Sequence, residues 1–311
     1  MSGVGRSVVD RAIFRRAVEA VIWGLPAVNY QRMYDAAVAI GGPGDNRVVY
    51  WSRLLDSRNQ TLTPNPETIY LMPFFNTTDG PVVLEIPAAE GGSSITGSID
   101  DGWQNALEDV GPAGMDQGTG GRYLILPPGF EAPLPAGYIA LPGVTYASFA
   151  LLRSNLQGGS DGQVVRAVDY GKRIRVYSLS DADDPPPTVF VDAADELFDA
   201  TIPYTADFFE VLHRFVQAEP WLTRDKAMID SLRTIGIAEW RGRDRRPCPW
   251  RSGSFAGRRS SPCPESARAR LERTGAEPRR SPPCTGWSRR TTHRRHRRTR
   301  SAGGSSASLN E

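Results

Sequence analysis

An abrupt change of composition near Ile237 limits what this chain can fold into. Residues 1–239 hold 18 Lys+Arg and 30 Asp+Glu, a net charge of about −12, whereas residues 240–311 hold 19 Arg, no Lys and 5 acids, about +14. The later segment contains no Ile, Val, Met or Tyr, so it has little apolar surface to bury. It also carries all three cysteines and two of the three histidines. The fold must therefore be sought in residues 1–239.

Three interpretations of the tail, residues 240–311, stay open. A disordered basic arm could bind nucleic acid through its arginines. A zinc site is disfavoured, because its ligands Cys263, Cys284, His293 and His296 lack a closely spaced cysteine pair. A GC-rich gene read in the wrong frame would yield this Arg, Pro, Ser, Gly and Ala composition. The third interpretation fits best, and we predict a disordered, frameshifted tail.

The remaining sequence carries neither a secretory nor a membrane signal. Residues 1–239 contain no cysteine, which excludes disulfides there, and no apolar run reaches the length of a membrane span. Charged residues interrupt the stretch that would form the apolar part of a signal peptide, and they are Asp10, Arg15, Arg16 and Glu19. As read, the product is predicted to be cytoplasmic, with no membrane span.

An N-terminal helical region is predicted over residues 1–46. Within 8–39, apolar side chains fall on one side of a helix at Ile13, Val18, Val21 and Ile22. Gly24 and Pro26 are expected to break or kink this helix. The sequence GGPGDN (41–46) then predicts a loop.

Residues 47–180 have the pattern of a β-sandwich. Short runs rich in Val, Ile, Tyr and Phe alternate with Gly, Pro, Asn and Asp at roughly ten-residue spacing. The clearest runs are 68–75, 81–87, 94–99, 122–128, 144–153 and 173–180. In the last run Ile174, Val176 and Ser178 alternate with Arg173, Arg175 and Tyr177, which predicts one buried face.

A small helical segment is predicted after the β region. The acidic, proline-rich linker DADDPPP (181–187) precedes it. Residues 192–218 and 223–237 are predicted as helices within a segment spanning 188–237. The overall expectation is a mainly β protein with an N-terminal helix, a sandwich and a helical segment.

Several kinds of catalytic site are excluded or disfavoured by the sequence. Residues 1–239 contain one histidine, His213, on an amphipathic helix, where a structural role is the simpler interpretation. The pattern G-x-S-x-G occurs in these residues only as GGSDG (158–162), which we do not interpret as a nucleophile elbow. The pattern G-x-G-x-x-G does not occur in them, and no glycine-rich phosphate loop follows a strand. Catalytic residues are therefore not assigned, and neither a metal site nor a cofactor is predicted.

The first candidate for ligand contacts is the segment TPNPETIY (63–70). Pro64 and Pro66 restrict the backbone on both sides of Asn65, so a rigid turn presents Asn65 and Glu67 before a strand that contains Tyr70. Such a turn could orient a ligand. The structural alternative is an ordinary start of a strand.

The second candidate is the sequence DDGWQN (100–105). Asp100 and Asp101 stand beside Trp103, Gln104 and Asn105, a combination typical of sites for carbohydrates or polar small molecules. Neighbouring residues of a strand point to opposite faces, so the two carboxylates cooperate only in a loop, which Gly102 favours. The structural alternative is a solvated turn beside a buried tryptophan. The loop GPAGMDQGTGG (111–121), with Asp116, could close over such a site.

Five motifs in order resemble a known bacterial family. They are NQTLTPNPETIY (59–70), PVVLEIP (81–87), GSIDDGWQNALEDVG (97–111), GGRYLILPPG (120–129) and LFDATIPYTADFFEVLH (197–213). Together they resemble the family named domain of unknown function 1254, which is commonly followed by domain of unknown function 1214. The resemblance spans residues 12–237.

The resemblance implies an immunoglobulin-like sandwich, a small helical segment and a C-terminal jelly-roll, in proteins that are often exported. This chain departs from that pattern, because no leader is visible and the tail begins where the second module is expected. The family name states no biochemical function.

We therefore predict an accessory β-module that binds a polar small molecule or a partner module. The alternative is a hydrolase whose site needs the C-terminal jelly-roll, and a second alternative is nucleic-acid binding through the tail. Homo-oligomer formation stays open.

Overall fold

Strands outnumber helices in the described part of the chain, which is residues 7–61 and 63–238 of a computed structural model. The strands are β1 (Arg47–Tyr50), β2 (Asn59–Gln60), β3 (Ile69–Asn76), β4 (Val82–Ile86), β5 (Ile95–Asp101), β6 (Ala106–Val110), β7 (Gly121–Leu126), β8 (Ile139–Pro142), β9 (Ala147–Ser154), β10 (Arg175–Ser178), β11 (Val189–Asp192) and β12 (Phe198–Asp199). Each of the six predicted runs contains or overlaps one of them. The predicted mainly β fold is confirmed.

Two larger sheets share an apolar core. A six-stranded sheet has the order β11-β1-β3-β9-β5-β6, and a four-stranded sheet has the order β10-β4-β7-β8. Leu71, Ile99 and Leu152 from the first sheet meet Leu84 and Tyr123 from the second in one buried cluster. This cluster removes apolar surface from water on the inner face of both sheets. A third, two-stranded sheet pairs β12 with β2.

The central strand β3 is buried on both faces, which explains its unbroken apolar sequence. Leu71 and Phe75 lie on the face of β3 that belongs to the core between the two sheets. Tyr70, Met72 and Phe74 lie on the opposite face, which belongs to the core shared with the helices. The paired positions of β3 and β9 skip Met72 and Pro73, because proline has no N–H to donate to the ladder. A strand covered on both sides needs no polar residues until its end.

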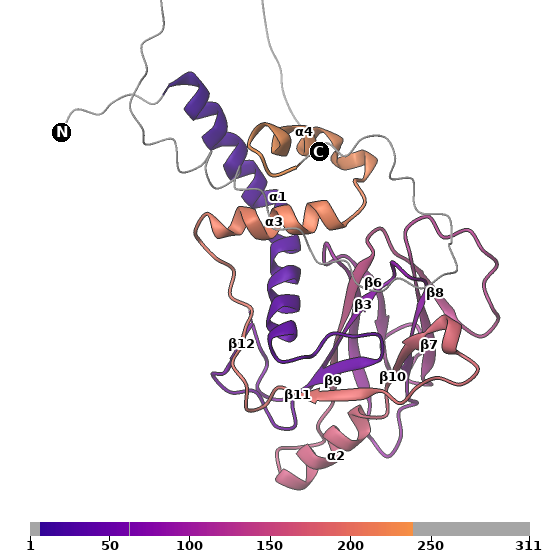
Figure 1. The fold of residues 1–311 in the computed structure, drawn as a ribbon. Helices are drawn as coiled ribbons and strands as arrows, with labels where there is room; N and C mark the ends of the chain where they lie inside the picture. Colours follow the sequence, from indigo (N-terminus) through magenta and orange to yellow (C-terminus); the bar gives the residue numbers. More distant parts are fainter. Residues whose placement is uncertain (1–6, 62, 239–311) are drawn as a thin grey trace, which may run out of the picture. The chain divides into compact units, whose positions relative to one another are not determined.

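The predicted N-terminal helix is confirmed as α1 (Val8–Ala39). Ser7 and Asp10 form a capping box at its start, which satisfies backbone N–H groups that would otherwise lack partners. Of the two predicted outcomes, a break does not occur, because α1 continues through Pro26, whereas Figure 1 shows a change of direction along α1, as a kink would produce. Val18 and Ile22 were predicted on the buried side but are 44% and 73% exposed.

Helices after the β region are confirmed as α3 (Asp207–Ala218) and α4 (Lys226–Thr234), joined through the short helix η2 (Thr223–Asp225). Figure 1 shows α3 crossing α1, and both contribute to one core with the outer face of the six-stranded sheet. Leu212 and Phe215 of α3 are almost fully buried there.

The predicted helical start at residue 192 is wrong. In its place β11 pairs in parallel with β1, and β12 pairs in parallel with β2. Both strands are short and find their partners about 140 residues earlier in the chain, so a local pattern carries little signal for them.

The predicted sandwich region also contains a helix that the sequence did not indicate, α2 (Asp161–Gly171), and a short helix, η1 (Leu179–Asp181). The predicted single buried face of β10 is wrong as well. Tyr177 is buried with Val83 and Leu124 on the far side of the four-stranded sheet. Loops that contribute Phe130 and Tyr138 cover that side.

The tail predicted as disordered, residues 240–311, lies outside the described residues. The proposed division of the body at residues 46, 180 and 188 stays a prediction. Strands β11 and β12, which follow the 181–187 linker, pair with strands that precede it.

Candidate functional site

A cavity of about 190 Å³ lies between α1 and the outer face of the six-stranded sheet. We call it the α1 cavity. Its lining comes from α1, the segment that follows β1, the turn after β5, and strands β3 and β9. The polar lining residues are Asn29, Asn59, Thr61, Thr63, Tyr70, Gln104 and Arg153.

Arg153 supplies the only charge among the described residues that line the α1 cavity. Strand register places it directly opposite Tyr70, so both side chains emerge from the same face of the sheet. The guanidinium lies 5.2 Å from the centre of the Tyr70 ring, and Nε is 3.4 Å from the tyrosine oxygen. Within the described part of the chain, Arg153 forms no ion pair with a carboxylate. It is thus a half-buried cation without a counterion of that kind.

Side-chain amides lie on the α1 side of the cavity. Gln104 donates from Nε2 to the carbonyl oxygen of Pro26 at 2.6 Å, and Asn29 donates to Gln104 Oε1 at 3.2 Å. Gln104 has a φ of 59°, a left-handed conformation that is uncommon for a residue other than glycine. Local backbone strain is therefore combined with contacts that tie the β5–β6 turn to α1.

Apolar side chains form the rest of the lining. They are Met33, Trp51, Leu55, Pro64, Met72, Phe149 and Leu151. Met72, Phe149 and Leu151 extend the same sheet face as Tyr70 and Arg153. One end of the cavity is thus cationic and the sheet beside it is apolar.

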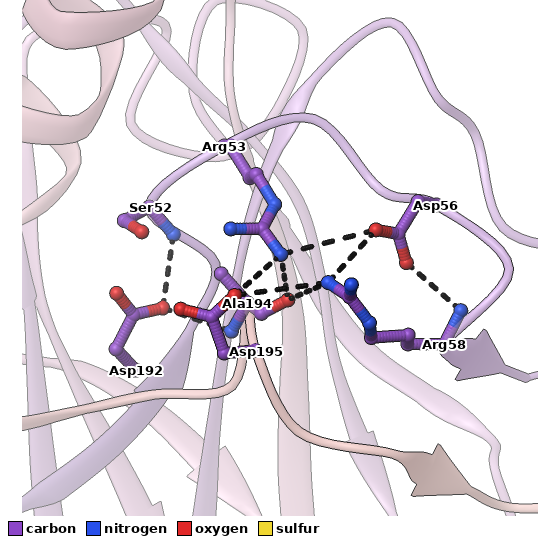
Figure 2. A network of polar contacts seen from close by, with 7 residues as sticks. All are labelled: Ser52, Arg53, Asp56, Arg58, Asp192, Ala194 and Asp195. Carbon is purple, nitrogen blue, oxygen red and sulfur yellow. Dashed lines mark hydrogen bonds and ion pairs between the residues drawn. The ribbon is translucent and has the colours of Figure 1, made fainter.

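The loop that contributes Trp51 and Leu55 is held by a polar network, shown in Figure 2. Arg53 donates to the carbonyl oxygen of Ala194 and pairs with Asp195 at 2.8 Å. The backbone N–H of Ser52 donates to Asp192 Oδ1 at 3.1 Å. Exposed ion pairs each contribute little, but together with the backbone contacts they join this loop to the segment after β11.

The turn TPNPETIY reaches the cavity through only some of its residues. Thr63, Pro64 and Tyr70 line it, and the Asn65 backbone N–H donates to the Tyr70 oxygen at 3.2 Å. Asn65 Oδ1 accepts from the Glu67 N–H at 2.8 Å, and both side chains are exposed. The local contacts of Asn65 and Glu67 are therefore those of a turn before a strand.

Asp101 organises the turn after β5. Its carboxylate is 1% exposed and accepts hydrogen bonds from the backbone N–H groups of Trp103 and Asn105, and from the Asn105 amide. The expectation that Asp100 and Asp101 lie in a loop is wrong, because both belong to β5 and so project to opposite faces. Burial, with the charges of Asp101 and Asp109, raises the pKa of Asp100 to about 6.

Trp103 packs in the helical core rather than in the α1 cavity. Its ring lies 4.5 Å from the Trp23 ring and 5.1 Å from the Phe215 ring. Its Nε1 is buried and donates no hydrogen bond within the described residues. Of the two predicted constellations, the structure brings Tyr70 and Gln104 to one cavity, and Asp100, Asp101, Trp103 and Asn105 do not line it.

The β-containing body can be compared with known proteins. Residues 46–178 match the model of a family described as "Protein of unknown function (DUF1254)". The match supports the DUF1254 family. The matched segment runs from just before β1 to the end of β10, so it includes Tyr70, Gln104 and Arg153 but excludes α1.

The solved structures with a similar fold include the crystal structure of the VPA0106 protein from Vibrio parahaemolyticus. The TM-score is 0.52 at 17% sequence identity, over 86% of this chain and 57% of that one. The chain thus spans little more than half of the length of VPA0106. At this identity the likeness concerns the fold alone. No curated protein matches the sequence.

Several lining residues outside the two predicted ligand-binding segments, 63–70 and 100–105, were missed. Asn29 lies on α1, outside the DUF1254 segment, Asn59 belongs to the two-residue strand β2, and Thr61 follows that strand. Arg153 lies near the end of the apolar strand β9. A charged residue directly after the apolar run ASFALL (147–152) was the sequence signal from which it could have been found. Only the pairing of β9 with β3 shows that it faces Tyr70.

Other candidate chemistry has a structural explanation. His213 Nδ1 contacts the carbonyl oxygen of Ile237, which joins α3 to the end of the described chain. Asp116 is buried and accepts from Tyr123 and the Gly120 N–H, so its loop is tied to β7. Across the described ranges, His, Cys, Asp and Glu side chains form no cluster suited to a metal ion. No helix within those ranges is long and apolar enough to cross a membrane.

Proposed function

We propose that this protein binds a small organic anion, a monocarboxylate with a short apolar body, in the α1 cavity. The observation that carries the proposal is Arg153, a half-buried cation whose only polar contact in the described chain is a long one to Tyr70. Leaving a charge partly desolvated without a counterion is unfavourable, and a bound carboxylate would relieve that cost. Arginine is suited to this role because its planar donors match both carboxylate oxygens.

The remaining lining supports the apolar part of the ligand. Met72, Phe149 and Leu151 would contact an alkyl or aryl group, while Asn29 and Gln104 offer hydrogen bonds near α1. A mostly apolar cavity with a few placed polar groups is the usual form of a small-molecule site.

The proposal keeps the accessory-module interpretation and an immunoglobulin-like arrangement of residues 47–180. Support for the latter comes from the two sheets that share one apolar core. The parallel pairs β7–β8 and β1–β11 are features that such an arrangement must accommodate. No specific contact favours the hydrolase alternative, since His213 is engaged by Ile237 at a distance from the α1 cavity lining.

Calorimetric titration with hexanoate and hexanamide tests the proposal. The two probes share a carbon skeleton, and only hexanoate carries a charge. We expect hexanoate to bind and Arg153→Gln to weaken it about 10- to 100-fold, the range of a charge-assisted hydrogen bond. Arg166→Gln, at an exposed position on α2, is the matched control and should bind like the wild type. Equal binding of hexanamide, or unchanged affinity in Arg153→Gln, would contradict the proposal.

A further inference from the structure

A second cavity, of about 340 Å³, borders α1, α3 and the end of β3. We call it the Glu219 cavity. Among the residues lining it are Tyr30, Tyr34, Asp45, Phe74, Phe215 and Glu219. Residues 29 and 33 of α1 line the first cavity, whereas residues 30, 31 and 34 line the second. The two cavities therefore share one helix but have different linings.

Glu219, directly after α3, is a buried carboxylate held in one position. It is 9% exposed, and its two oxygens accept from the backbone N–H groups of Tyr146 at 2.6 Å and Ala147 at 3.1 Å. Two backbone amides favour the ionised carboxylate and fix its orientation, but they leave further lone pairs on both oxygens. The carboxylate can therefore accept from a ligand without losing these contacts.

Aromatic side chains line the same cavity as this carboxylate, among them Tyr30, Tyr34, Phe74 and Phe215. The Tyr30 ring lies 6.0 Å from Phe215 and 6.2 Å from both Tyr34 and Phe74, and the rings of Tyr34 and Phe74 are 5.6 Å apart. The electron-rich faces of such rings attract cations, and several rings around one acid form the type of cage that binds organic ammonium groups.

The charges of the lining have one sign. Glu219 and Asp45 are acidic, and the described residues that line this cavity include neither Lys nor Arg. The α1 cavity has the opposite character, because its one charged residue is Arg153. A low-dielectric cavity with acids alone attracts positive charge and disfavours anions.

We propose that the Glu219 cavity binds a small organic cation of the alkylammonium class, with the Glu219 carboxylate as counterion and the rings of Tyr30, Tyr34, Phe74 and Phe215 around it. The proposal is independent of anion binding in the α1 cavity, because the two linings share no residue.

Binding at this site should depend on pH through Glu219. Burial of the carboxylate, with a smaller effect from the charge of Asp101, raises the pKa of Glu219 to about 7. The two backbone hydrogen bonds lower this pKa, but by less than burial raises it. Only the ionised form attracts a cation, so affinity should rise with pH. The other titratable groups that line a cavity with Glu219 or interact with it are Tyr30, Tyr34, Asp45, Asp101, Tyr146 and Asp225. Asp35 of α1 acts on Tyr30 and Tyr34. Arg214 is paired with Asp35 at 2.6 Å.

Choline and its uncharged carbon analogue, 3,3-dimethyl-1-butanol, are the probes, titrated calorimetrically into the full-length protein. We expect choline to bind at pH 8 at least about tenfold more tightly than the alcohol, because the two differ chiefly in charge. Between pH 6 and pH 8 the choline affinity should rise about tenfold, as a carboxyl with a pKa near 7 goes from mostly neutral to mostly ionised.

Variants locate the binding. Glu219→Gln should weaken choline binding about tenfold or more and remove its pH dependence, whereas Glu210→Gln, the same change within α3, should do neither. If Glu219→Gln fails to fold, Tyr34→Leu, which keeps the carboxylate, should weaken choline several-fold. The proposal is overturned by equal binding of the alcohol, by pH-independent affinity, or by absence of choline binding at about 10 mM.

Discussion

At the scale of single residues, buried carboxylates define how the turns of this protein are held. Asp101 accepts hydrogen bonds from two backbone N–H groups and from the Asn105 amide in the turn that follows β5, and Asp116 ties its loop to Tyr123. Neither side chain projects into the α1 cavity. Their chemistry is satisfied within the fold, in contrast to Arg153, whose described contacts leave it without a carboxylate partner.

Asp101→Ala should destabilise the protein by about 2 kcal/mol or more, because two backbone N–H groups in a buried turn lose their acceptor. Asp101→Asn should cost less, since its amide oxygen can still accept from both. The control is Asp109→Ala on β6, where an exposed carboxylate accepts a hydrogen bond from the Ser98 hydroxyl. This change should lower the free energy of unfolding by less than about 1 kcal/mol. Urea unfolding measures all three, and an equal loss at positions 101 and 109 would contradict this role.

Glu219 should make stability depend on pH. Its folded-state pKa is raised to about 7, so between about pH 4.5 and 7 the folded state holds a proton that the unfolded state releases. The stability contributed by this group is therefore fully present below about pH 4.5 and is lost as pH rises through 7, roughly 3 kcal/mol in all. Urea unfolding of Glu219→Gln should show a flatter pH profile over this window than the wild type. Parallel profiles would contradict the assignment.

At the scale of elements, the packing of α1 on α3 depends on Gly24. A β-carbon at this position would lie 2.6 Å and 2.7 Å from the two methyl groups of Leu212, which is fully buried. The glycine thus allows close approach of the two helices, and α1 is the element that lines both cavities.

Gly24→Val should therefore destabilise the protein by about 2 kcal/mol, because the buried Leu212 has little room to move. Glu19→Val places the same β-branched side chain on the exposed side of α1 and should cost less than about 1 kcal/mol. Thermal unfolding distinguishes them, and equal melting temperatures would show that the two helices do not pack as described.

Strands with strong local signals could be predicted, and those that depend on distant partners could not. β3, β4 and β7 are apolar runs bounded by Gly, Pro or Asn, so the pattern alone identifies them. β11 and β12 are only four and two residues long, and each pairs with a strand about 140 residues earlier in the chain, so a local pattern does not identify them. The helix α2, which lies between β9 and β10, was also missed.

The candidate site was predictable only in part. The TPNPETIY and DDGWQN motifs led to Tyr70 and Gln104, which do line the α1 cavity. Arg153, Asn29 and Asn59 come from separate elements, and no local spacing relates them. Their convergence depends on the β3–β9 register and on the position of α1, which are properties of the fold.

At the scale of the whole molecule, the described body and the arginine-rich tail are expected to act separately. A chain ending at residue 238 should bind hexanoate with the affinity of the full-length protein, because every described lining residue precedes that point. Any retention on DNA should disappear with the tail, which carries 19 arginines. Loss of hexanoate binding on truncation, or DNA retention that survives it, would contradict this separation.

The most direct test of the account is a crystal structure of the protein soaked with hexanoate. The account predicts the carboxylate within hydrogen-bond distance of the Arg153 guanidinium, with the alkyl chain against Met72, Phe149 and Leu151. A well-ordered α1 cavity that holds only water at a saturating hexanoate concentration, or hexanoate bound elsewhere with Arg153 free, would contradict it.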